Sequence, residues 1–333
     1  MNNMKGVVIK MNSSDFYKSK AQIEYPANSD DIGKIPPCSQ AVKDQIHSLC
    51  ARHPFIKFTK FGESVSGKPL LAVAVGNGQR RVIYSASHHA NEWITTNVLL
   101  RFLTELCEKV ASDGEISGCF ARELLRVSCL CFVPLINPDG VDLVTGNLTY
   151  GTYYDRARQI ANHFPEIPFP EGWKANINGV DLNLQYPARW EKAKEIKLLK
   201  GFDRPSPRDY AGSFPLCEPE SVALASITAM ADPDLVVAFH SQGKEIYWKF
   251  GDSEPEGSRE LGLLLAEASG YELSDTPSES ANAGYKDWFI QEFKRPGYTI
   301  EVGLGENPLP LSQFDEIYTA TAPLIVKAAI GRD

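Results

Sequence analysis

The sequence of 333 residues contains no apolar run that approaches the roughly 20 residues needed to cross a membrane. Residues 1–20 also lack the apolar segment and the small-residue cleavage site of a signal peptide. From these absences we expect a cytoplasmic protein that is not bound to a membrane. The formal net charge of -8 disfavours nucleic acid as a partner.

Cysteines are few and show no recognisable pairing pattern. The seven cysteines form an odd number, and none of them belongs to a CxxC motif. Because several of them lie in apolar periodic segments, the sequence favours buried reduced thiols over a disulfide scaffold.

Hydrophobic patterning predicts an alternation of strands and helices after residue 36. Strands are predicted over residues 55–61, 70–75, 81–87, 127–136, 234–240 and 298–302, and helices over 39–52, 94–110, 218–230, 259–269 and 311–330. This alternation is typical of the α/β class. Residues 1–36 are polar and irregular, and we expect them to form an N-terminal arm or short extension before one large domain over residues 37–333.

Three connecting segments carry predictions of their own. Asn77-Gly78 predicts a hairpin that leads into the strand over 81–87, and residues 137–140 (NPDG) predict a tight turn. Residues 144–178 show little periodicity. A loop of that length is usually functional, and a solvated insertion is the alternative.

Histidine and glutamate residues stand at the ends of predicted strands. His89 and Glu92 lie three residues apart just after the strand over 81–87, and His240 ends the strand over 234–240. Ligands of open α/β sheets bind outside the carboxyl ends of the strands, so these side chains can share one site. Two imidazoles and one carboxylate are typical of a catalytic zinc site with a position open for water. The HxxE motif alone is also compatible with a helix start beside a core histidine.

Glu301 adds a second carboxylate at the end of the last predicted strand. It stands between Ile300 and Val302, where a charged group is costly unless it has a partner or a task. Beside a metal site, such a carboxylate can accept a proton from water and pass it to a leaving amine.

Seven segments in this order resemble the M14 (carboxypeptidase A-like) family of zinc peptidases, over most of the chain from about residue 56. The segments are residues 88–93 (HHANEW), 137–140 (NPDG), 179–183 (GVDLN), 218–221 (EPES), 239–243 (FHSQG), 286–288 (KDW) and 298–303 (YTIEVG). The resemblance implies a mixed, mostly parallel central sheet of about eight strands flanked by helices, with the catalytic domain over residues 37–333.

The same resemblance implies roles for individual residues. One zinc ion per chain is expected to be held by His89, Glu92 and His240, with Glu301 as the general base and acid. Asp181 matches the acid that accepts a hydrogen bond from the first zinc histidine and fixes its tautomer.

The residues expected to bind substrate depart from the family pattern. Asn183 is present, but Leu184 stands where the family has the arginine that binds a C-terminal carboxylate. Lys174 follows a tryptophan where the family has an arginine that stabilises the oxyanion. Arg189 or another cation can substitute for the missing arginine. Lys286 is expected in the pocket for the residue after the scissile bond, and the alternative is a solvated lysine at a helix start.

Residues 178–190 and 239–248 are similar to the γ-D-glutamyl-meso-diaminopimelate peptidases (endopeptidase I type) of spore-forming bacteria. This branch implies a muropeptide substrate and cleavage of the γ-D-glutamyl–meso-diaminopimelate amide bond. One alternative is an ordinary metallocarboxypeptidase that releases C-terminal amino acids from peptides. The other is an inactive peptide-binding module, which the retained Glu301 and metal ligands disfavour. The sequence predicts no oligomeric state.

Overall fold

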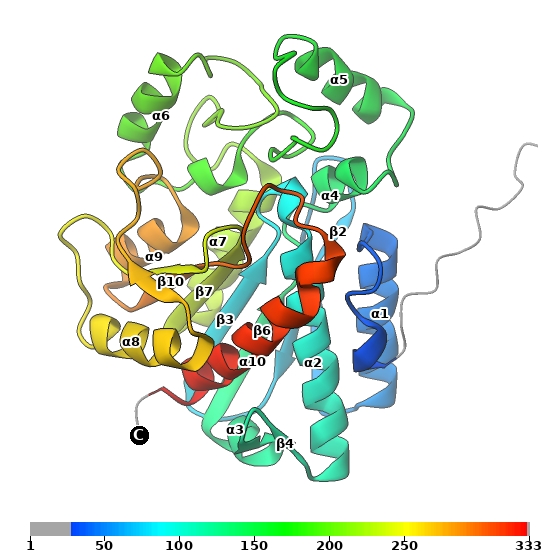
Figure 1. Cartoon of the computed structure of the whole chain (residues 1–333), viewed down its shortest axis with the longest axis vertical. Helices are drawn as coiled ribbons and strands as arrows, with labels where there is room; N and C mark the ends of the chain where they lie inside the picture. The colour runs from blue at the N-terminus through cyan, green and yellow to red at the C-terminus, as the bar shows by residue number, and fades with distance from the viewer. Residues whose placement is uncertain (1–27, 332–333) are drawn as a thin grey trace, which may run out of the picture.

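The computed structural model describes residues 28–331, which are organised around one eight-stranded mixed sheet (Figure 1). In spatial order the strands are β1 (Ile56–Glu63), β2 (Pro69–Val75), β6 (Ser128–Val133), β3 (Arg80–Ala86), β7 (Leu235–His240), β10 (Gly297–Glu301), β8 (Glu245–Tyr247) and β9 (Glu272–Ser274). Four of the seven neighbouring pairs are parallel. The predicted mixed, mostly parallel sheet is therefore confirmed.

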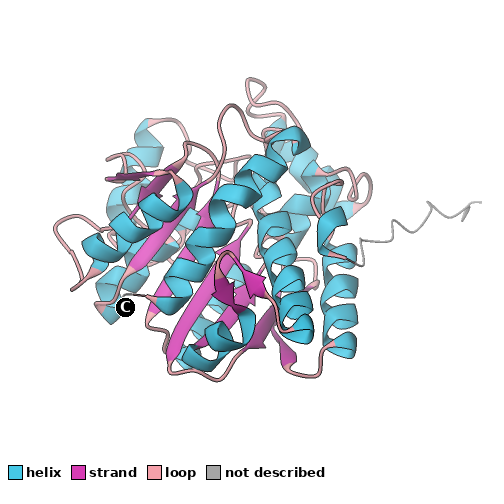
Figure 2. Cartoon of the chain, turned by 60° about the horizontal axis from the view of Figure 1, so that its bottom comes forward, coloured by secondary structure: helices cyan, strands magenta, loops and turns pink. Residues whose placement is uncertain are grey.

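Helices cover both faces of this sheet, as the turned view also shows (Figure 2). One face carries α1 (Ser39–Arg52), α2 (Ile94–Ser112), α8 (Ser258–Ser269) and α10 (Phe314–Ile330), and the other carries α7 (Pro219–Ala231) and α9 (Tyr285–Phe293). The short helix α3 (Ala121–Val127) follows the two-stranded β4 (Glu115–Ile116) and β5 (Cys119–Phe120). Among the helices of residues 28–331, none combines the length and the apolarity needed to span a bilayer.

The central strands are apolar on both sides because both faces of the sheet are covered. On β3, Val82 and Tyr84 pack into the core beneath α2 and α10, whereas Ile83 packs into the core beneath α7 and α9. The Tyr84 hydroxyl donates a hydrogen bond of 2.8 Å to the carbonyl of Ile325 on α10. Alternation between two apolar layers explains why the sequence shows continuous apolar runs here.

The predicted hairpin at Asn77-Gly78 is wrong. β2 and β3 do not pair with each other, because β6 lies between them and pairs with both. The amide of Gly78 donates to the carbonyl of Ser128 at 3.2 Å, and a Cβ atom at Gly78 would lie 1.9 Å from the carbonyl carbon of Val127. Glycine is required here by this close approach of two backbones rather than by a tight turn.

The predictions for the two later connections are also corrected. Residues 137–140 begin the helix α4 (Pro138–Val144), with the Asn137 side chain accepting a hydrogen bond from the Gly140 amide. An asparagine cap followed by proline is a helix start, which the turn-rich composition concealed. The segment 144–178 contains the helix α5 (Thr152–Ala161), whose two buried residues are both alanines.

Most of the predicted N-terminal arm, residues 1–27, lies outside the described residues. Just after it, the 3-10 helix η1 (Ser29–Asp31) contacts α2, where the Ser29 hydroxyl donates to Glu108 Oε2 at 2.7 Å. Ile32 is buried in the main core. The described end of the predicted arm is thus packed on the domain, and the boundary at residue 36 stays a prediction.

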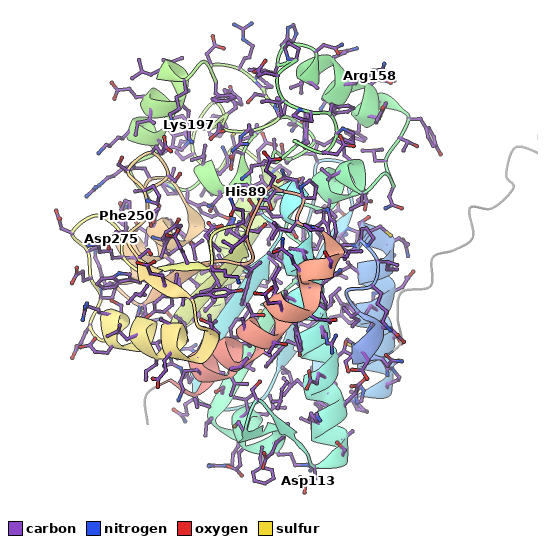
Figure 3. All side chains as sticks on the ribbon, viewed as in Figure 1. His89, Asp113, Arg158, Lys197, Phe250 and Asp275 are labelled. Atoms are coloured by element: carbon purple, nitrogen blue, oxygen red, sulfur yellow. The ribbon has the colours of Figure 1, made fainter. Side chains whose placement is uncertain are left out.

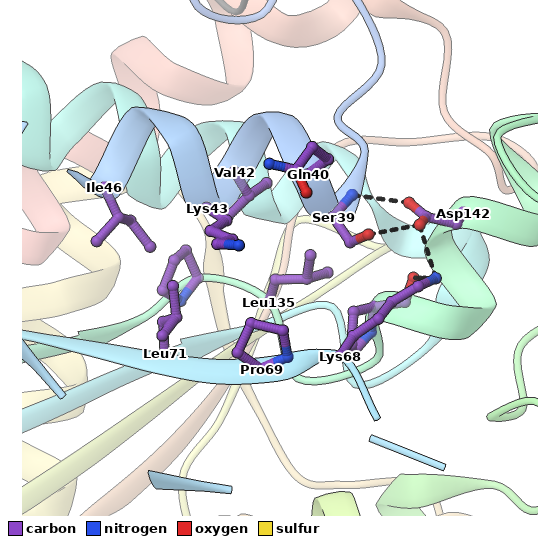
Figure 4. Close-up of a pocket in the computed structure, with 12 residues that line it drawn as sticks. Ser39, Gln40, Val42, Lys43, Ile46, Lys68, Pro69, Leu71, Leu135 and Asp142 are labelled. Atoms are coloured by element: carbon purple, nitrogen blue, oxygen red, sulfur yellow. Dashed lines mark hydrogen bonds and ion pairs between the residues drawn. The ribbon is translucent and has the colours of Figure 1, made fainter. Parts of the chain in front are cut away.

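A cavity of about 300 Å³ lies between α1, β2 and the start of α4 (Figure 4). The Ser39 amide donates to Asp142 Oδ1 at 2.7 Å, and Lys68 Nζ lies 2.7 Å from Asp142 Oδ2. Ser39 is the first residue of α1, and Cys38 occupies the cap position before it. Asp142 thus pairs with Lys68 and joins α1 to α4 through Ser39.

Candidate metal centre and active site

The three predicted metal ligands come from two neighbouring strands. His89 follows the end of β3, and Glu92 is the last residue of the 3-10 helix η2 (Ala90–Glu92), which Trp93 joins to α2. His240 is the last residue of β7, which pairs with β3 in parallel. Figure 3 shows His89 at the end of the sheet that faces α5 and α6 (Trp190–Leu199), opposite the end marked by Asp113.

The ligand atoms of these side chains converge on one point. His89 Nδ1 lies 2.9 Å from Glu92 Oε1, and His240 Nδ1 lies 3.0 Å from Glu92 Oε2. The two Nδ1 atoms are 3.3 Å apart, and one ligand atom from each residue lies within 4.8 Å of the others. Sequence reasoning had selected these residues, and the structure brings them together.

The donor set fits a divalent metal such as zinc. Two imidazole nitrogens and a carboxylate are common zinc donors, and they leave a coordination position for water or substrate. Burial alone would lower the pKa of His89, but Glu92 and Asp181 raise it to about 9. Surroundings that hold an extra positive charge this firmly are suited to a cation between the imidazoles.

Asp181 lies on the far side of the His89 ring from the proposed metal position. His89 Nε2 is 3.1 Å from Asp181 Oδ1, which also accepts a hydrogen bond of 3.0 Å from the Asn183 amide. Burial opposes ionisation of Asp181, but His89 holds the pKa of this carboxyl well below its usual range. An ionised Asp181 can keep a proton on Nε2, which would leave the lone pair of Nδ1 available to a metal held by His89.

Glu301 is the last residue of β10 and lies in register with His240 on β7. Burial, together with repulsion from Glu92, raises the pKa of Glu301 to about 8. Its carboxyl group lines the cavity in front of the metal ligands. A carboxyl group with a pKa near neutrality can both accept and return a proton at physiological pH.

Lys174 supplies a cation on another side of the same centre. Its Nζ atom lies 2.9 Å from Glu92 Oε1. Burial would lower the pKa of Lys174, and the charge of Arg208 acts in the same direction. The carboxylate of Glu92 outweighs both, so the pKa of Lys174 is raised. The Lys174 carbonyl accepts a hydrogen bond of 2.9 Å from the Ala90 amide, which fixes this lysine beside the metal-binding segment.

These residues open into a cavity of about 810 Å³ at the carboxyl ends of the strands. Besides His89, Glu92, Glu301 and Lys174, its lining includes Asn183, Arg208, Tyr247 and Asn307. The cavity is large enough for a short peptide and contains both the metal site and the candidate base. It is therefore the candidate active site.

Two further predicted binding residues do not line this cavity. The Arg189 guanidinium lies over the Phe250 ring, with 4.9 Å between Cζ and the ring centroid. Lys286 is 4% exposed, donates a hydrogen bond of 2.6 Å to the Lys249 carbonyl and pairs with Asp287. In this structure both cations are engaged by other residues, and their roles toward substrate stay predictions.

Leu184 points into an apolar cluster instead of the cavity. The cluster consists of Leu184, Trp190, Ala193, Ala211 and Ala283. Only its neighbour Asn183 lines the cavity. The leucine that replaces the family's arginine is thus buried by apolar packing.

Sequence reasoning missed Arg208 and Asn307. The Ser241 hydroxyl donates to Asn307 Oδ1 at 2.7 Å, and Asn307 Nδ2 donates to the Ser241 carbonyl at 2.8 Å. This pair joins the segment after β7 to the segment after β10, next to the metal ligands. Neither residue stands in a periodic element or at a motif spacing, so the sequence offered no signal for them.

Comparison with known proteins places this site in a family. Residues 42–323 match the zinc carboxypeptidase family of M14 peptidases. The chain belongs to the zinc carboxypeptidase family. As a member of this family it is a zinc metallopeptidase, which confirms the predicted family, enzyme class and metal.

Individual relatives agree with this assignment. The chain is 43% identical over 277 residues to gamma-D-glutamyl-L-diamino acid endopeptidase 1 of Lysinibacillus sphaericus, covering 83% of this chain and 67% of the relative. Its fold is similar to bovine thrombin-activatable fibrinolysis inhibitor in complex with tick carboxypeptidase inhibitor, with a TM-score of 0.69 at 19% identity, covering 89% of this chain and 97% of that chain. Carboxypeptidase A from Helicoverpa armigera gives a TM-score of 0.68 at 18% identity, covering 95% and 78%.

Proposed function

We propose that this zinc carboxypeptidase family member hydrolyses the γ-D-glutamyl–meso-diaminopimelate amide bond of cell-wall peptides, with muropeptides as its substrates. The observation that carries the proposal is the packing of Leu184 into an apolar cluster beside Asn183. A carboxypeptidase needs a cation there to bind a free C-terminal carboxylate. The relative from Lysinibacillus sphaericus, whose name specifies a γ-D-glutamyl-L-diamino acid bond, supports the same substrate class.

The proposed roles of the residues follow from their positions. When bound by His89, Glu92 and His240, zinc polarises the scissile carbonyl and makes water more acidic. Glu301 accepts the proton of the attacking water and then donates it to the departing amine of diaminopimelate. Lys174 places its ammonium group where negative charge develops on the carbonyl oxygen.

The remaining residues are proposed to hold these groups and the substrate in place. Asp181 keeps His89 in the tautomer whose Nδ1 faces the metal position. Asn183 lines the cavity and is proposed to bind substrate there. For Lys286 or Arg189 to contact substrate directly, each must leave the partner that engages it in this structure. The cytoplasmic location expected from the sequence stays a prediction.

The experiment compares two substrates with zinc-loaded protein. L-Ala-γ-D-Glu-meso-diaminopimelate whose C-terminal carboxyl is blocked as the amide tests the proposed bond, and a blocked dipeptide with a free C-terminal carboxylate tests ordinary carboxypeptidase activity. We expect release of the diaminopimelate amide from the first peptide and little hydrolysis of the second. Release from the dipeptide alone would contradict the proposal and establish the carboxypeptidase alternative. Hydrolysis of neither would favour the inactive binding module.

A further inference from the structure

Arg208 occupies a fixed place at the wall of the active-site cavity. The carbonyl of the preceding Pro207 accepts hydrogen bonds from the amides of Lys174 and Ala175, at 2.8 and 2.9 Å. The amide of the following Asp209 donates to Asp181 Oδ2 at 3.3 Å. The backbone around Arg208 is thus tied both to the segment that carries Lys174 and to the acid that orients His89.

The guanidinium group of Arg208 is only partly engaged by the protein. Its Nε atom donates to Asp209 Oδ2 at 2.8 Å, and Asp209 is shared with Lys197. Within residues 28–331, neither Nη1 nor Nη2 of Arg208 has a recorded hydrogen-bond or ion-pair partner, and 42% of the side chain is exposed. Two adjacent N–H groups of one guanidinium plane match the two oxygens of a carboxylate.

The two long-chain cations of the cavity wall lie close together. Among the described residues that line the cavity, Lys174 is the one lysine and Arg208 the one arginine, and the hydrogen bonds to Pro207 tie their segments to each other. In the proposed mechanism Lys174 faces the charge that develops on the acyl oxygen, so Arg208, whose charge acts on Lys174, lies within reach of the acyl residue of the substrate.

The acyl residue of the proposed substrate carries an anion at this end. A glutamyl residue that is linked through its side-chain carboxyl keeps its α-carboxylate free. An ordinary α-linked residue has no such group, because its α-carboxyl is the one that is cleaved. Only three carbon atoms separate the free α-carboxylate from the scissile carbonyl, so the carboxylate reaches the cation next to Lys174.

We propose that Arg208 binds the free α-carboxylate of the γ-D-glutamyl residue and thereby selects γ-linked over α-linked substrates. This assignment rests on the proposed function and names the residue that gives it specificity on the acyl side. Arg208 is also the only cation at the cavity wall, apart from the reaction-centre residues Lys174 and His89, within the described part of the chain.

The test compares two peptides that differ in this one charge. L-Ala-γ-D-Glu-meso-diaminopimelate carries the α-carboxylate, and the D-isoglutamine counterpart carries a neutral carboxamide in its place. For the wild type we expect kcat/KM to be about 10- to 100-fold higher for the free acid, the usual range for a charge-assisted hydrogen-bond pair. Arg208→Gln should bring this ratio close to 1, and Arg208→Lys should restore part of it.

Arg204→Gln is the matched control. Arg204 pairs with its neighbour Asp203 much as Arg208 pairs with Asp209, but it does not line the cavity. Its replacement should leave the ratio of kcat/KM at the wild-type value.

The two proposals fail in different ways. The role of Arg208 is overturned if the wild type cleaves the two peptides with nearly equal kcat/KM, or if Arg208→Gln lowers kcat/KM equally for both peptides. Either result leaves the proposed function intact. If the wild type cleaves neither γ-linked peptide but cleaves the blocked dipeptide, the proposed function falls and the assignment of Arg208 falls with it.

Discussion

The Nε2 atom of His89 lies 3.1 Å from Oδ1 of Asp181, and this contact turns the Nδ1 atom of the same ring toward Glu92 and His240. The metal position thus depends on a residue that does not face it. The contact joins the end of β3 to the 3-10 helix η3 (Leu182–Leu184), which begins just after Asp181.

Asp181→Asn should therefore weaken zinc binding without removing a ligand. The amide oxygen can still accept a hydrogen bond, but the negative charge that favours a metal-bound imidazole is lost. We expect zinc affinity to fall about 10- to 100-fold, measured by competition with a coloured chelator. Asp203→Asn, at an exposed carboxylate away from the cavity, is the control. Unchanged affinity in Asp181→Asn would contradict the role of this contact.

Glu301→Gln should separate catalysis from metal binding. Glutamine has nearly the same shape, but it cannot accept the proton of water and return it to the amine. We expect kcat on the γ-D-glutamyl peptide to fall about 10²- to 10⁴-fold, with about one zinc per chain retained. Zinc content by atomic absorption and steady-state kinetics measure the two quantities. Near-normal turnover by the zinc-loaded Glu301→Gln variant would exclude Glu301 as the proton carrier.

Removal of zinc should abolish activity but leave the fold in place. The ligands sit at the edge of an eight-stranded sheet with apolar layers on both faces, so the core does not need the metal. After treatment with a chelator we expect an unchanged far-UV circular dichroism spectrum and a lower Tm, because zinc binds only the folded state. Zinc addition should restore activity. Loss of the spectrum on chelation would show that the metal is structural.

Glu220 should make stability depend on pH. It is fully buried at the start of α7, where it accepts hydrogen bonds from the Val65 amide and from Asn176 Nδ2. Burial raises the pKa of Glu220 to about 7. The folded state holds this proton more tightly than the unfolded chain, whose glutamate pKa is about 4.3. Protonated Glu220 therefore contributes its full share of stability at pH values below the glutamate pKa of the unfolded chain. This contribution is lost as the pH rises through the folded-state pKa of about 7.

Glu220→Gln removes this titration and tests the prediction. Relative to the wild type, its free energy of unfolding should increase by roughly 2–3 kcal/mol between about pH 5 and pH 8. Both proteins are unfolded by chemical denaturant in the presence of a chelator, so that pH-dependent zinc binding does not contribute to the difference in unfolding free energy. The lost hydrogen bond from Asn176 adds a cost that does not vary with pH. A difference that stays constant over this range would show that Glu220 is ionised at both pH values.

Leu184→Arg should not convert the protein into a carboxypeptidase. Leu184 is 6% exposed in its apolar cluster, and an unpaired guanidinium there is costly. We expect a loss of about 2–4 kcal/mol in unfolding free energy and no new hydrolysis of the blocked dipeptide. Leu184→Ala gives the cost of lost packing alone. Dipeptide hydrolysis by a stable Leu184→Arg variant would show that the side chain reaches the cavity.

The sequence was sufficient to select the candidate metal ligands, which the structure brings together, because each belongs to a local pattern. His89 and Glu92 have a fixed spacing, and His240 and Glu301 end apolar strands, so the parallel sheet alone brings them to one edge. Arg208 could not be selected in this way. Its place depends on the hydrogen bonds of Pro207 and Asp209 to distant segments, and no periodicity reports such contacts.

The same distinction explains the errors in the fold. The segment around Asn77-Gly78 has the composition of a hairpin, but β6 enters between β2 and β3 and takes the pairing of both. A nonlocal strand overrides a local turn signal. The helix α5 was missed because it covers other loops with alanine and leaves its larger side chains partly exposed.

β7 enters the sheet between β3 and β10, and Val82 of β3 pairs with Leu235 of β7 far along the chain. A newly made chain therefore carries His89 and Glu92 long before it carries their third partner. The proposed zinc site can be complete only when synthesis has passed β7 and that strand has docked. Glu301 on β10, the proposed proton carrier, is made later still. With these roles, the order of the strands delays hydrolytic activity until almost the entire chain has been made, and zinc uptake during refolding would report that the centre of the sheet has closed.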